Sequence, residues 1–430
     1  MKLTNLGGAT GILEHDGKRM LFDPWMDDGI FHGAWYHYPP MNVKLEDLGR
    51  FDYVYISHIH EDHCSAGTIR HLNRDAEIIL MDRTPNLVAR FLEAHDFQFR
   101  KIHLVKPRTE VCLAPGLTVD MVEPDPANQM SHAIDSALLI RWNGFTVYNA
   151  NDCQPYDAGM NYILGKYGPP DLALLPYAGG SGYPSCYTNL TVEEKAHEKQ
   201  RILQSRLNGF VATVKRLNPR YAMPFADQYA VAGSRSDLNK YICHPPCPGV
   251  LSAALANTPF ADRLLLLNSG QNYDFDNSVK TPPDDYRHFS EEDRETYLTG
   301  KLRDKLYDHE KIRLSPSVAI DRLVAHARGR LWGMQQRTGF RPQFSLYLDV
   351  RDTGRRFQIL LDQEVSREVD RGEMLAQPYL KLSCDHTLMI MLLLGAVSWN
   401  IADAALFIDY ERIPNVYDAN VYVHLNYLRV

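Results

Sequence analysis

Short apolar runs and turn residues alternate along the first 226 residues of the chain. Many of these runs are rich in valine, isoleucine and aromatic residues and are bounded by glycine, asparagine or proline, which is typical of strands. Helical stretches separate several of them, so the pattern predicts an α/β region. Asn143 and Gly144, between two of the runs, predict a two-residue hairpin turn. The predicted strands cover residues 2–7, 9–15, 19–25, 51–58, 76–82, 117–123, 136–142, 145–152, 171–180 and 220–226.

Three local signals predict where helices begin in this region. Ser65 is placed to cap a short helix, because its hydroxyl can accept from a backbone N–H of the first turn. Thr84 followed by Pro85 predicts a helix with proline at its first position. Thr191 and Glu194 have the spacing of a capping box and predict the start of a long helix.

The pattern changes after about residue 256. A stretch rich in proline, aspartate and asparagine predicts a boundary between a domain over 1–270 and a smaller α+β domain over 280–430. The order of strands and apolar helix in the second domain is similar to that of sterol-carrier-like domains, and a plain α+β packing domain is the alternative. Its predicted helices cover 290–307 and 316–337, its predicted strands 343–350 and 356–362, and an apolar helical segment follows residue 379.

Composition narrows the class of protein. The chain is 45% hydrophobic and 23% charged, a balance typical of globular proteins. A net charge of -7 argues against nucleic acid or an anionic membrane as partner. The start of the chain lacks the apolar stretch of a signal peptide, and the longest apolar run, 388–397, is too short to span a bilayer. Seven scattered cysteines suit a reducing compartment, so we expect a cytoplasmic protein.

The densest chemical signal lies at residues 57–63, which read SHIHEDH directly after a predicted strand. His58, His60, Asp62 and His63 offer four metal ligands within six positions. Imidazole and carboxylate groups together suit divalent first-row metals. The alternative, a solvated polar loop, does not explain the placement of the motif at a strand end.

The H-x-H-x-D-H motif after a strand resembles that of the metallo-β-lactamase superfamily. The resemblance implies an α/β fold, a four-layered αβ/βα sandwich, with a dinuclear metal site between its two sheets. It also implies that Asp152, at the end of a predicted strand, bridges the two metals.

Other stretches are similar to the CMP-N-acetylneuraminate hydroxylase branch of this superfamily. They are LFDPW (21–25), DSALLIRWNGFTVYNANDC (135–153), AGGSGYP (178–184) and NPRYAMPFADQY (218–229). Those hydroxylases carry a Rieske domain, whereas this sequence has no C-x-H followed by C-x-x-H. The resemblance therefore implies a separate electron-donating reductase. In its domain arrangement the chain then resembles the metallo-β-lactamase-fold diiron oxygenases of antibiotic biosynthesis more closely. Examples are the chloramphenicol-type β-hydroxylase and the platensimycin-type diterpenoid hydroxylase.

The resemblance also suggests further ligands. His132 matches the position of the third ligand of the first metal, and Glu123 is the alternative because the chloramphenicol-type enzymes use a carboxylate there. The second metal usually receives a histidine from a P-x-H strand end, but this chain has Ala226 at that position. Asp227 beside it is the expected substitute, with His244 or water as alternatives.

Four aromatic residues are candidates for the wall of a substrate pocket, although ordinary packing is the alternative for each. They are Trp25, Tyr177, Tyr183 and Tyr229.

The sequence therefore favours a non-heme diiron monooxygenase that hydroxylates an organic molecule, for example a bulky apolar natural-product intermediate, with O2 as co-substrate. A carboxylate-enriched site suits two iron ions. The first alternative is a lactonase-like or phosphodiesterase-like hydrolase, in which zinc or manganese activates water. The second is a binding protein with a purely structural metal site. The sequence predicts neither the substrate nor the oligomeric state.

Overall fold

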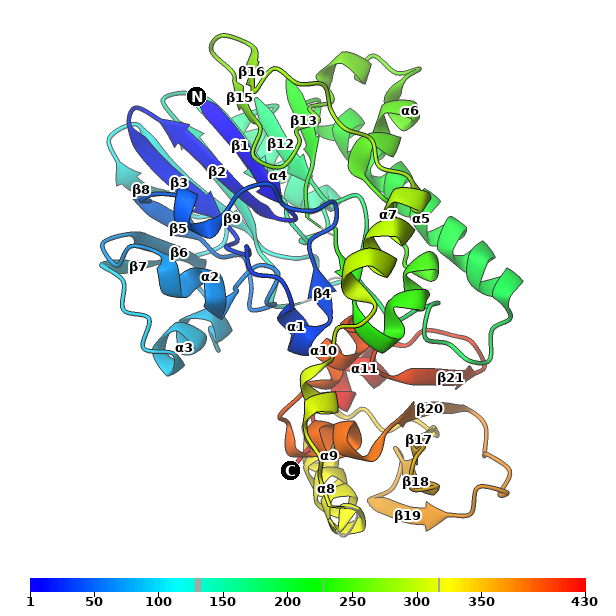
Figure 1. Cartoon of the computed structure of the whole chain (residues 1–430). Helices are drawn as coiled ribbons and strands as arrows, with labels where there is room; N and C mark the ends of the chain where they lie inside the picture. The colour runs from blue at the N-terminus through cyan, green and yellow to red at the C-terminus, as the bar shows by residue number, and fades with distance from the viewer. Residues whose placement is uncertain (128–132, 227, 316–317) are drawn as a thin grey trace.

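The computed structural model describes residues 1–127, 133–226, 228–315 and 318–430. An eight-stranded sheet opens the fold, in the order β16-β15-β1-β2-β3-β5-β6-β7 (Figure 1). Strands β3, β5, β6 and β7 are parallel to one another, so their carboxyl ends share one edge. The strands are β1 (Lys2–Gly7), β2 (Thr10–His15), β3 (Lys18–Phe22), β5 (Tyr53–Tyr55), β6 (Glu77–Met81), β7 (Lys101–Val105), β15 (Asn272–Asp274) and β16 (Val279–Thr281).

A second sheet of six strands faces the first, in the order β13-β12-β11-β10-β9-β8. Its last three strands along the chain are parallel, and β10 and β11 form the predicted hairpin. Asn143 and Gly144 have φ values of 48° and 89°, the left-handed conformation that a type I′ turn requires. The strands are β8 (Val111–Ala114), β9 (Leu117–Val122), β10 (Ala137–Trp142), β11 (Phe145–Asn149), β12 (Leu172–Leu175) and β13 (Tyr221–Pro224).

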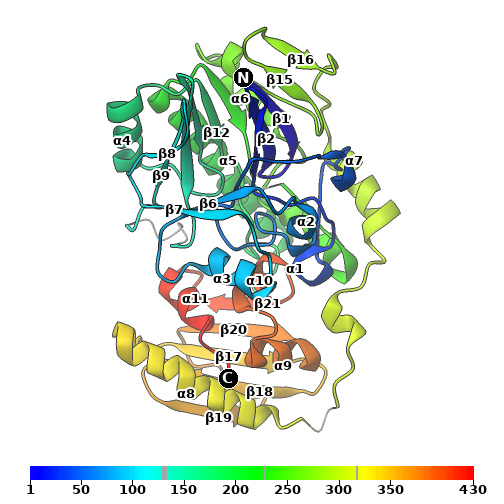
Figure 2. The same cartoon turned by 90° about the vertical axis from the view of Figure 1, so that its left-hand side faces the viewer.

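Helices cover the outer faces of both sheets (Figures 1 and 2). In β5, Tyr53 and Tyr55 point into the core between the sheets, and Val54 points outward beneath the helices. This alternation follows from the two-residue period of a strand. The first sheet is covered by α2 (Ala66–His71) and α3 (Leu87–Ala94), and the second by α4 (Asp157–Tyr167), α5 (Val192–Leu217) and α6 (Leu251–Leu255). The predicted four-layered sandwich is thus confirmed.

Two of the three predicted helix starts are confirmed. The Ser65 hydroxyl accepts from Thr68 N at the start of α2, and the capping box of Thr191 begins α5. The start predicted at Pro85 is wrong. Helix α3 begins at Leu87, because the side chain of Asn86 caps it and leaves the proline outside the first turn.

The C-terminal part has its own five-stranded sheet, in the order β19-β18-β17-β20-β21. Both views show α8 and α9 on one face of this sheet (Figures 1 and 2). The elements are α7 (Glu291–Tyr297), α8 (Ile320–Thr338), β17 (Ser345–Val350), β18 (Arg355–Leu360), β19 (Val365–Val369), β20 (Tyr379–Cys384), α9 (His386–Leu394), α10 (Trp399–Ala404), β21 (Asp409–Ile413) and α11 (Ala419–Leu425). An additional C-terminal α+β domain is therefore present, and its likeness to sterol-carrier domains stays a prediction.

The two parts of the chain share one hydrophobic cluster. Trp25, Trp35 and Tyr229 from the sandwich belong to the same cluster as Leu346 and Leu392 from the C-terminal part. The remaining short elements lie near this junction: α1 (Ile30–Gly33), β4 (Trp35–Tyr36) and β14 (Ala230–Val231). Strands β15 and β16 extend the first sheet to residue 281. The division of the chain at 270–280 stays a prediction.

Within the described residues, the structure has no helix that is both long and apolar enough to cross a membrane.

Candidate metal centre

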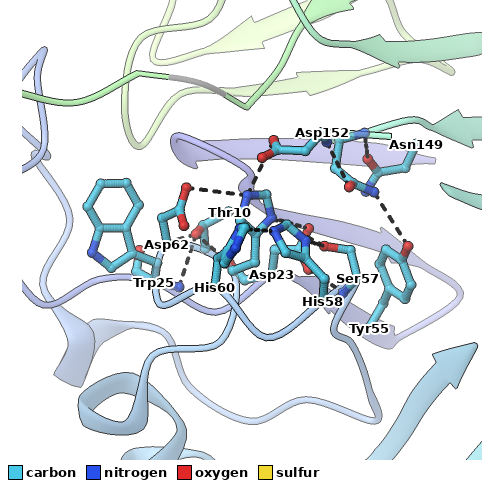
Figure 3. Close-up of polar contacts among 12 residues, drawn as sticks. Thr10, Asp23, Trp25, Tyr55, Ser57, His58, His60, Asp62, Asn149 and Asp152 are labelled. Carbon is cyan, nitrogen blue, oxygen red and sulfur yellow. Dashed lines mark hydrogen bonds and ion pairs between the residues drawn. The ribbon is translucent and has the colours of Figure 1, made fainter. Parts of the chain in front are cut away.

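The predicted ligands meet at one edge of the sandwich. Residues 57–63 follow β5, and Asp152 follows β11 in the opposite sheet. Figure 3 shows the side chain of Asp152 approaching those of His58, His60 and Asp62 from the other sheet. The carboxyl ends of parallel strands are where ligands bind in open α/β sheets, and here two such edges face each other.

We call His58, His60, Asp62, His63 and Asp152 the ligand cluster, or simply the cluster. His58 and His60 form its first half. His58 Nε2 lies 2.8 Å from His60 Nδ1, so these two ring nitrogens converge on one point. The opposite nitrogens have other partners, Ser57 Oγ at 3.0 Å from His58 Nδ1 and Asn400 Oδ1 at 2.9 Å from His60 Nε2. Burial lowers the pKa of His60, which favours the neutral imidazole that a metal needs.

His63 forms the second half together with two carboxylates. Its Nε2 lies 3.3 Å from Asp152 Oδ1 and 3.4 Å from Asp62 Oδ2. Burial alone would lower the pKa of His63, but Asp152, Asp62 and Asp23 together raise this pKa well above its usual value. The site therefore has an excess of negative charge, which a bound cation can neutralise as well as a proton can.

Asp23, a residue that the sequence did not mark as part of the site, supports His63 from behind. It is fully buried after β3 and has a φ of 40°, an uncommon conformation for aspartate. Its Oδ1 accepts from Ser57 N at 2.7 Å, and its Oδ2 accepts from His63 Nδ1 at 3.0 Å. A carboxylate that holds one ring nitrogen fixes the tautomer and leaves the other free for a metal. The sequence signal was the FDP triplet at a strand end.

Asparagines hold Asp152 in place. Asp152 N donates to Asn151 Oδ1 at 2.7 Å, and Asn151 Nδ2 donates to Ser136 O at 2.8 Å. Asn151 N in turn donates to Asn149 Oδ1 at 3.1 Å. This network after β11 directs the Asp152 carboxylate toward His63.

The donor set fits a metal ion. His58, His63 and Asp152 each offer a ligand atom within 4.8 Å of the others. In a tetrahedral site with bonds of about 2.0–2.1 Å, neighbouring ligand atoms are about 3.3 Å apart, and the His63–Asp152 and His63–Asp62 separations match this spacing. Within the described part of the chain, Asp62 Oδ1 is buried and makes no hydrogen bond, and the buried His63 Nε2 faces the carboxylates of Asp62 and Asp152. Ligation would satisfy both atoms.

The other predicted ligands lie elsewhere or outside the described residues. The carboxylate of Glu123 faces Arg108, with Oε1 2.7 Å from Nη2. His244 is buried against the ring of Tyr229, with ring centroids 4.9 Å apart, and its Nδ1 contacts Pro245 O. His132 and Asp227 lie outside the described residues. The ligand roles of all these residues stay predictions.

Ala226 stands where the superfamily pattern has a histidine. It is buried and has a φ of 67°, and its N–H donates to Gly8 O at 3.0 Å. A non-glycine residue in this left-handed conformation is uncommon and costs energy. The backbone is therefore held against the β1–β2 turn at the edge where the cluster lies.

The four predicted pocket aromatics are packed in different places. Trp25 stacks on His37 with ring centroids 3.8 Å apart, and Tyr229 stacks on Trp35 at 3.4 Å. Tyr177 donates to Gln228 Oε1, and Tyr183 donates to Glu198 Oε2. Of the four predicted aromatics, only Tyr177 lines the large cavity of the structure.

That cavity has a volume of about 1030 Å³. Gly8, Tyr177 and Ala226 line one side, and residues of the segment 282–301 line the other. Among the described residues, no side chain of the cluster lines this cavity. In the described part of the chain, the cavity is therefore lined by the β1–β2 turn and the chain after β13, and not by the loops that carry the cluster.

Comparison with known protein families identifies the domain that carries the cluster. Residues 18–225 match the beta-lactamase superfamily domain, a stretch that contains the His58–His63 motif and Asp152. The chain therefore contains a beta-lactamase superfamily domain, with the metallo-β-lactamase fold that the sandwich displays.

Curated relatives narrow the resemblance. A Rieske-like 2Fe-2S iron-sulfur protein of Mycobacterium tuberculosis is 32% identical over 194 residues, 44% of this chain and 36% of that protein. Cytidine monophosphate-N-acetylneuraminic acid hydroxylase of Xenopus laevis is 30% identical over 255 residues, 56% of this chain and 40% of the hydroxylase. The aligned part thus covers well under half the length of these relatives.

Solved structures have lower sequence identity to this chain than the curated relatives have. An isothiocyanate hydrolase from Delia radicum gut bacteria has a TM-score of 0.45 at 18% identity, over 64% of this chain and 99% of that one. The diiron beta-hydroxylase CmlA from Streptomyces venezuelae has a TM-score of 0.38 at 17% identity, over 52% of this chain and 44% of that one.

Proposed function

We propose that this protein is a non-heme iron oxygenase that hydroxylates a small organic molecule, with two iron ions held by the cluster. The observation that carries the proposal is the composition of the second half of the cluster, where one histidine, His63, stands between the carboxylates of Asp62 and Asp152. Histidine with carboxylate at open positions is the donor set of non-heme iron oxygenases. The similarity to a curated hydroxylase points the same way.

The residues have distinct roles in this proposal. His58 and His60 would hold one iron, Asp62 and His63 would hold the other, and Asp152 would contribute a carboxylate from the opposite sheet. Iron bound in this way supplies the activation of dioxygen, with one oxygen atom entering the substrate and the other leaving as water. Asp23 keeps the proton of His63 on Nδ1, so that Nε2 stays available.

Two electrons are needed for each turnover, and the 430 residues contain no Rieske ligand pattern. We therefore propose that a separate reductase supplies them. We further propose that the organic substrate enters through the large cavity, beside Gly8, Tyr177 and Ala226.

Metal analysis and oxygen uptake test this function without a known substrate. Protein produced with iron and without added zinc should contain two irons per chain. After anaerobic reduction with dithionite and removal of the excess, it should consume O2 in proportion to its iron, whereas His63→Ala protein should not. Less than one iron per chain, with zinc or manganese in its place, would contradict the proposal.

The second candidate is a metal-dependent hydrolase, favoured by the beta-lactamase superfamily domain itself. Zinc in the same cluster would lower the pKa of bound water and create a nucleophile. Zinc-loaded protein should then hydrolyse p-nitrophenyl acetate or bis(p-nitrophenyl) phosphate without oxygen. Such turnover, lost in His63→Ala protein, would favour the hydrolase over the oxygenase.

A further inference from the structure

Helix α10 of the C-terminal domain lies at the junction with the sandwich (Figure 1). Its start is fixed by Ser398, whose hydroxyl accepts from Ile401 N at 3.0 Å. Asn400 occupies the first turn, and its Oδ1 lies 2.9 Å from His60 Nε2. A residue 340 positions away in the sequence therefore contacts the H-x-H-x-D-H motif.

The chemistry of this contact decides the tautomer of His60. An amide oxygen only accepts hydrogen bonds, so His60 Nε2 must carry the proton that Asn400 Oδ1 receives. His60 Nδ1 then has its lone pair, and this atom faces His58 Nε2 at 2.8 Å. Asn400 thus directs the unprotonated nitrogen of His60 toward the point where a metal would bind.

The position of Asn400 is enforced by further contacts of α10. Asp403 Oδ2 accepts from Gly182 N at 3.3 Å, and Ala404 O accepts from Trp35 Nε1 at 2.9 Å. A Cβ atom at Gly182 would lie 2.6 Å from Asp403 Oδ1, so a side chain at this position would displace the Asp403 carboxylate. The helix is therefore docked on β4 and on the loop at Gly182 as well as on His60.

We propose that Asn400 is a positioning residue of the metal centre, and that the C-terminal domain completes the centre by holding the His60 imidazole in its ligating tautomer and orientation. This inference rests on metal binding by His58 and His60, but not on which metal binds or which reaction follows. Partners that hold the second nitrogen of a ligating histidine typically affect metal affinity 10- to 100-fold.

Cobalt titration of the metal-free full chain tests the proposal, because the visible spectrum of Co²⁺ reports its ligands. The wild-type chain should bind two Co²⁺ ions. Asn400→Ala should weaken one of the two sites by about 10- to 100-fold and change its absorption spectrum. Asn400→Asp keeps the acceptor and should stay within about threefold of the wild type in that site, so it serves if the alanine variant does not fold. Asn420→Ala, an exposed asparagine of the same domain, is the matched control and should change nothing.

The outcomes distinguish the role of Asn400 from the existence of the metal centre itself. If Asn400→Ala binds two Co²⁺ ions with wild-type affinity and spectrum, the role of Asn400 is wrong and the metal centre stands. If both substitutions weaken the site equally, the acceptor is not what matters and the inference also fails. If the wild-type chain itself binds no Co²⁺, the proposed metal centre fails first.

Discussion

At the scale of single residues, three carboxylates surround one histidine. Asp23, Asp62 and Asp152 face His63 from three sides, and only Asp23 contacts Nδ1. The other two lie near Nε2. Their roles therefore differ, because Asp23 selects the tautomer while Asp62 and Asp152 lie where they can share a cation with His63.

The Asp23→Asn substitution tests this division of roles. The new amide can keep its oxygen toward Ser57 N, but its NH2 group then faces His63 Nδ1 and donates to it. The histidine proton must move to Nε2, which can no longer bind a metal. We expect the second metal site to lose about 10- to 100-fold in affinity, measured by Co²⁺ titration and by metal analysis after dialysis.

Asp75→Asn is the control for this variant, because Asp75 is exposed and pairs with Arg50 on the surface. Its metal content should equal that of the wild type. Wild-type affinity of both metal sites in Asp23→Asn protein would show that Asp23 is only a packing residue of the strand end.

At the scale of elements, the sequence predicts best what is local. The strand that delivers His58 and the capping box of α5 are set by neighbouring residues, and the structure contains both. The start of α3 was misplaced because two capping signals, Pro85 and Asn86, are adjacent. The edge strand β7 was missed, and its burial is the reverse of the usual rule, because apolar Ile102 and Leu104 are exposed while His103 is buried.

The candidate site likewise combines local residues, which the sequence predicts, with a long-range contact, which it does not. His58, His60, Asp62 and His63 are adjacent in sequence, so their spacing alone places them together, and Asp152 came from the family resemblance. Asn400 could not be predicted, because its contact with His60 depends on how the C-terminal domain docks. No local pattern carries information about that docking.

The docking of α10 has a pH dependence that can be measured. Burial raises the pKa of Asp403, the carboxylate that accepts from Gly182 N. The folded protein therefore holds this proton more tightly than the unfolded chain does. The resulting stabilisation is fully present below the unfolded pKa of about 3.8 and is lost as pH rises through the folded pKa.

Asp403→Asn removes this dependence while keeping an oxygen that can accept from Gly182 N. We expect the variant to be more stable than the wild type at pH 8, by on the order of 1 kcal/mol, and the difference to shrink at pH 4.5. Urea unfolding at both pH values measures it. Asp304→Asn, an exposed aspartate, is the control and should show no such difference. A loss of stability at pH 8 would mean that the charge of Asp403 itself holds the helix.

At the scale of the whole molecule, the sandwich and the C-terminal domain are joined through a shared hydrophobic cluster. Trp35 lies at the joint. It is 5% exposed, stacks on Tyr229 at 3.4 Å and donates from Nε1 to Ala404 O. Because apolar residues of both parts belong to one cluster, we expect the wild-type chain to unfold in a single cooperative transition.

Trp35→Ala should weaken the contact between the two domains more than it destabilises either domain by itself. The cavity left by a buried tryptophan costs about 3–5 kcal/mol, and this loss falls on the contact between the domains. Urea unfolding followed by far-UV circular dichroism and by tryptophan fluorescence should then show two separate transitions. Trp332→Ala on α8 is the matched control, because Trp332 is half-buried and faces the guanidinium groups of Arg328 and Arg341, so it should keep one transition. Coincident transitions in Trp35→Ala protein would show that other contacts couple the domains, and that the C-terminal domain can support His60 without this joint.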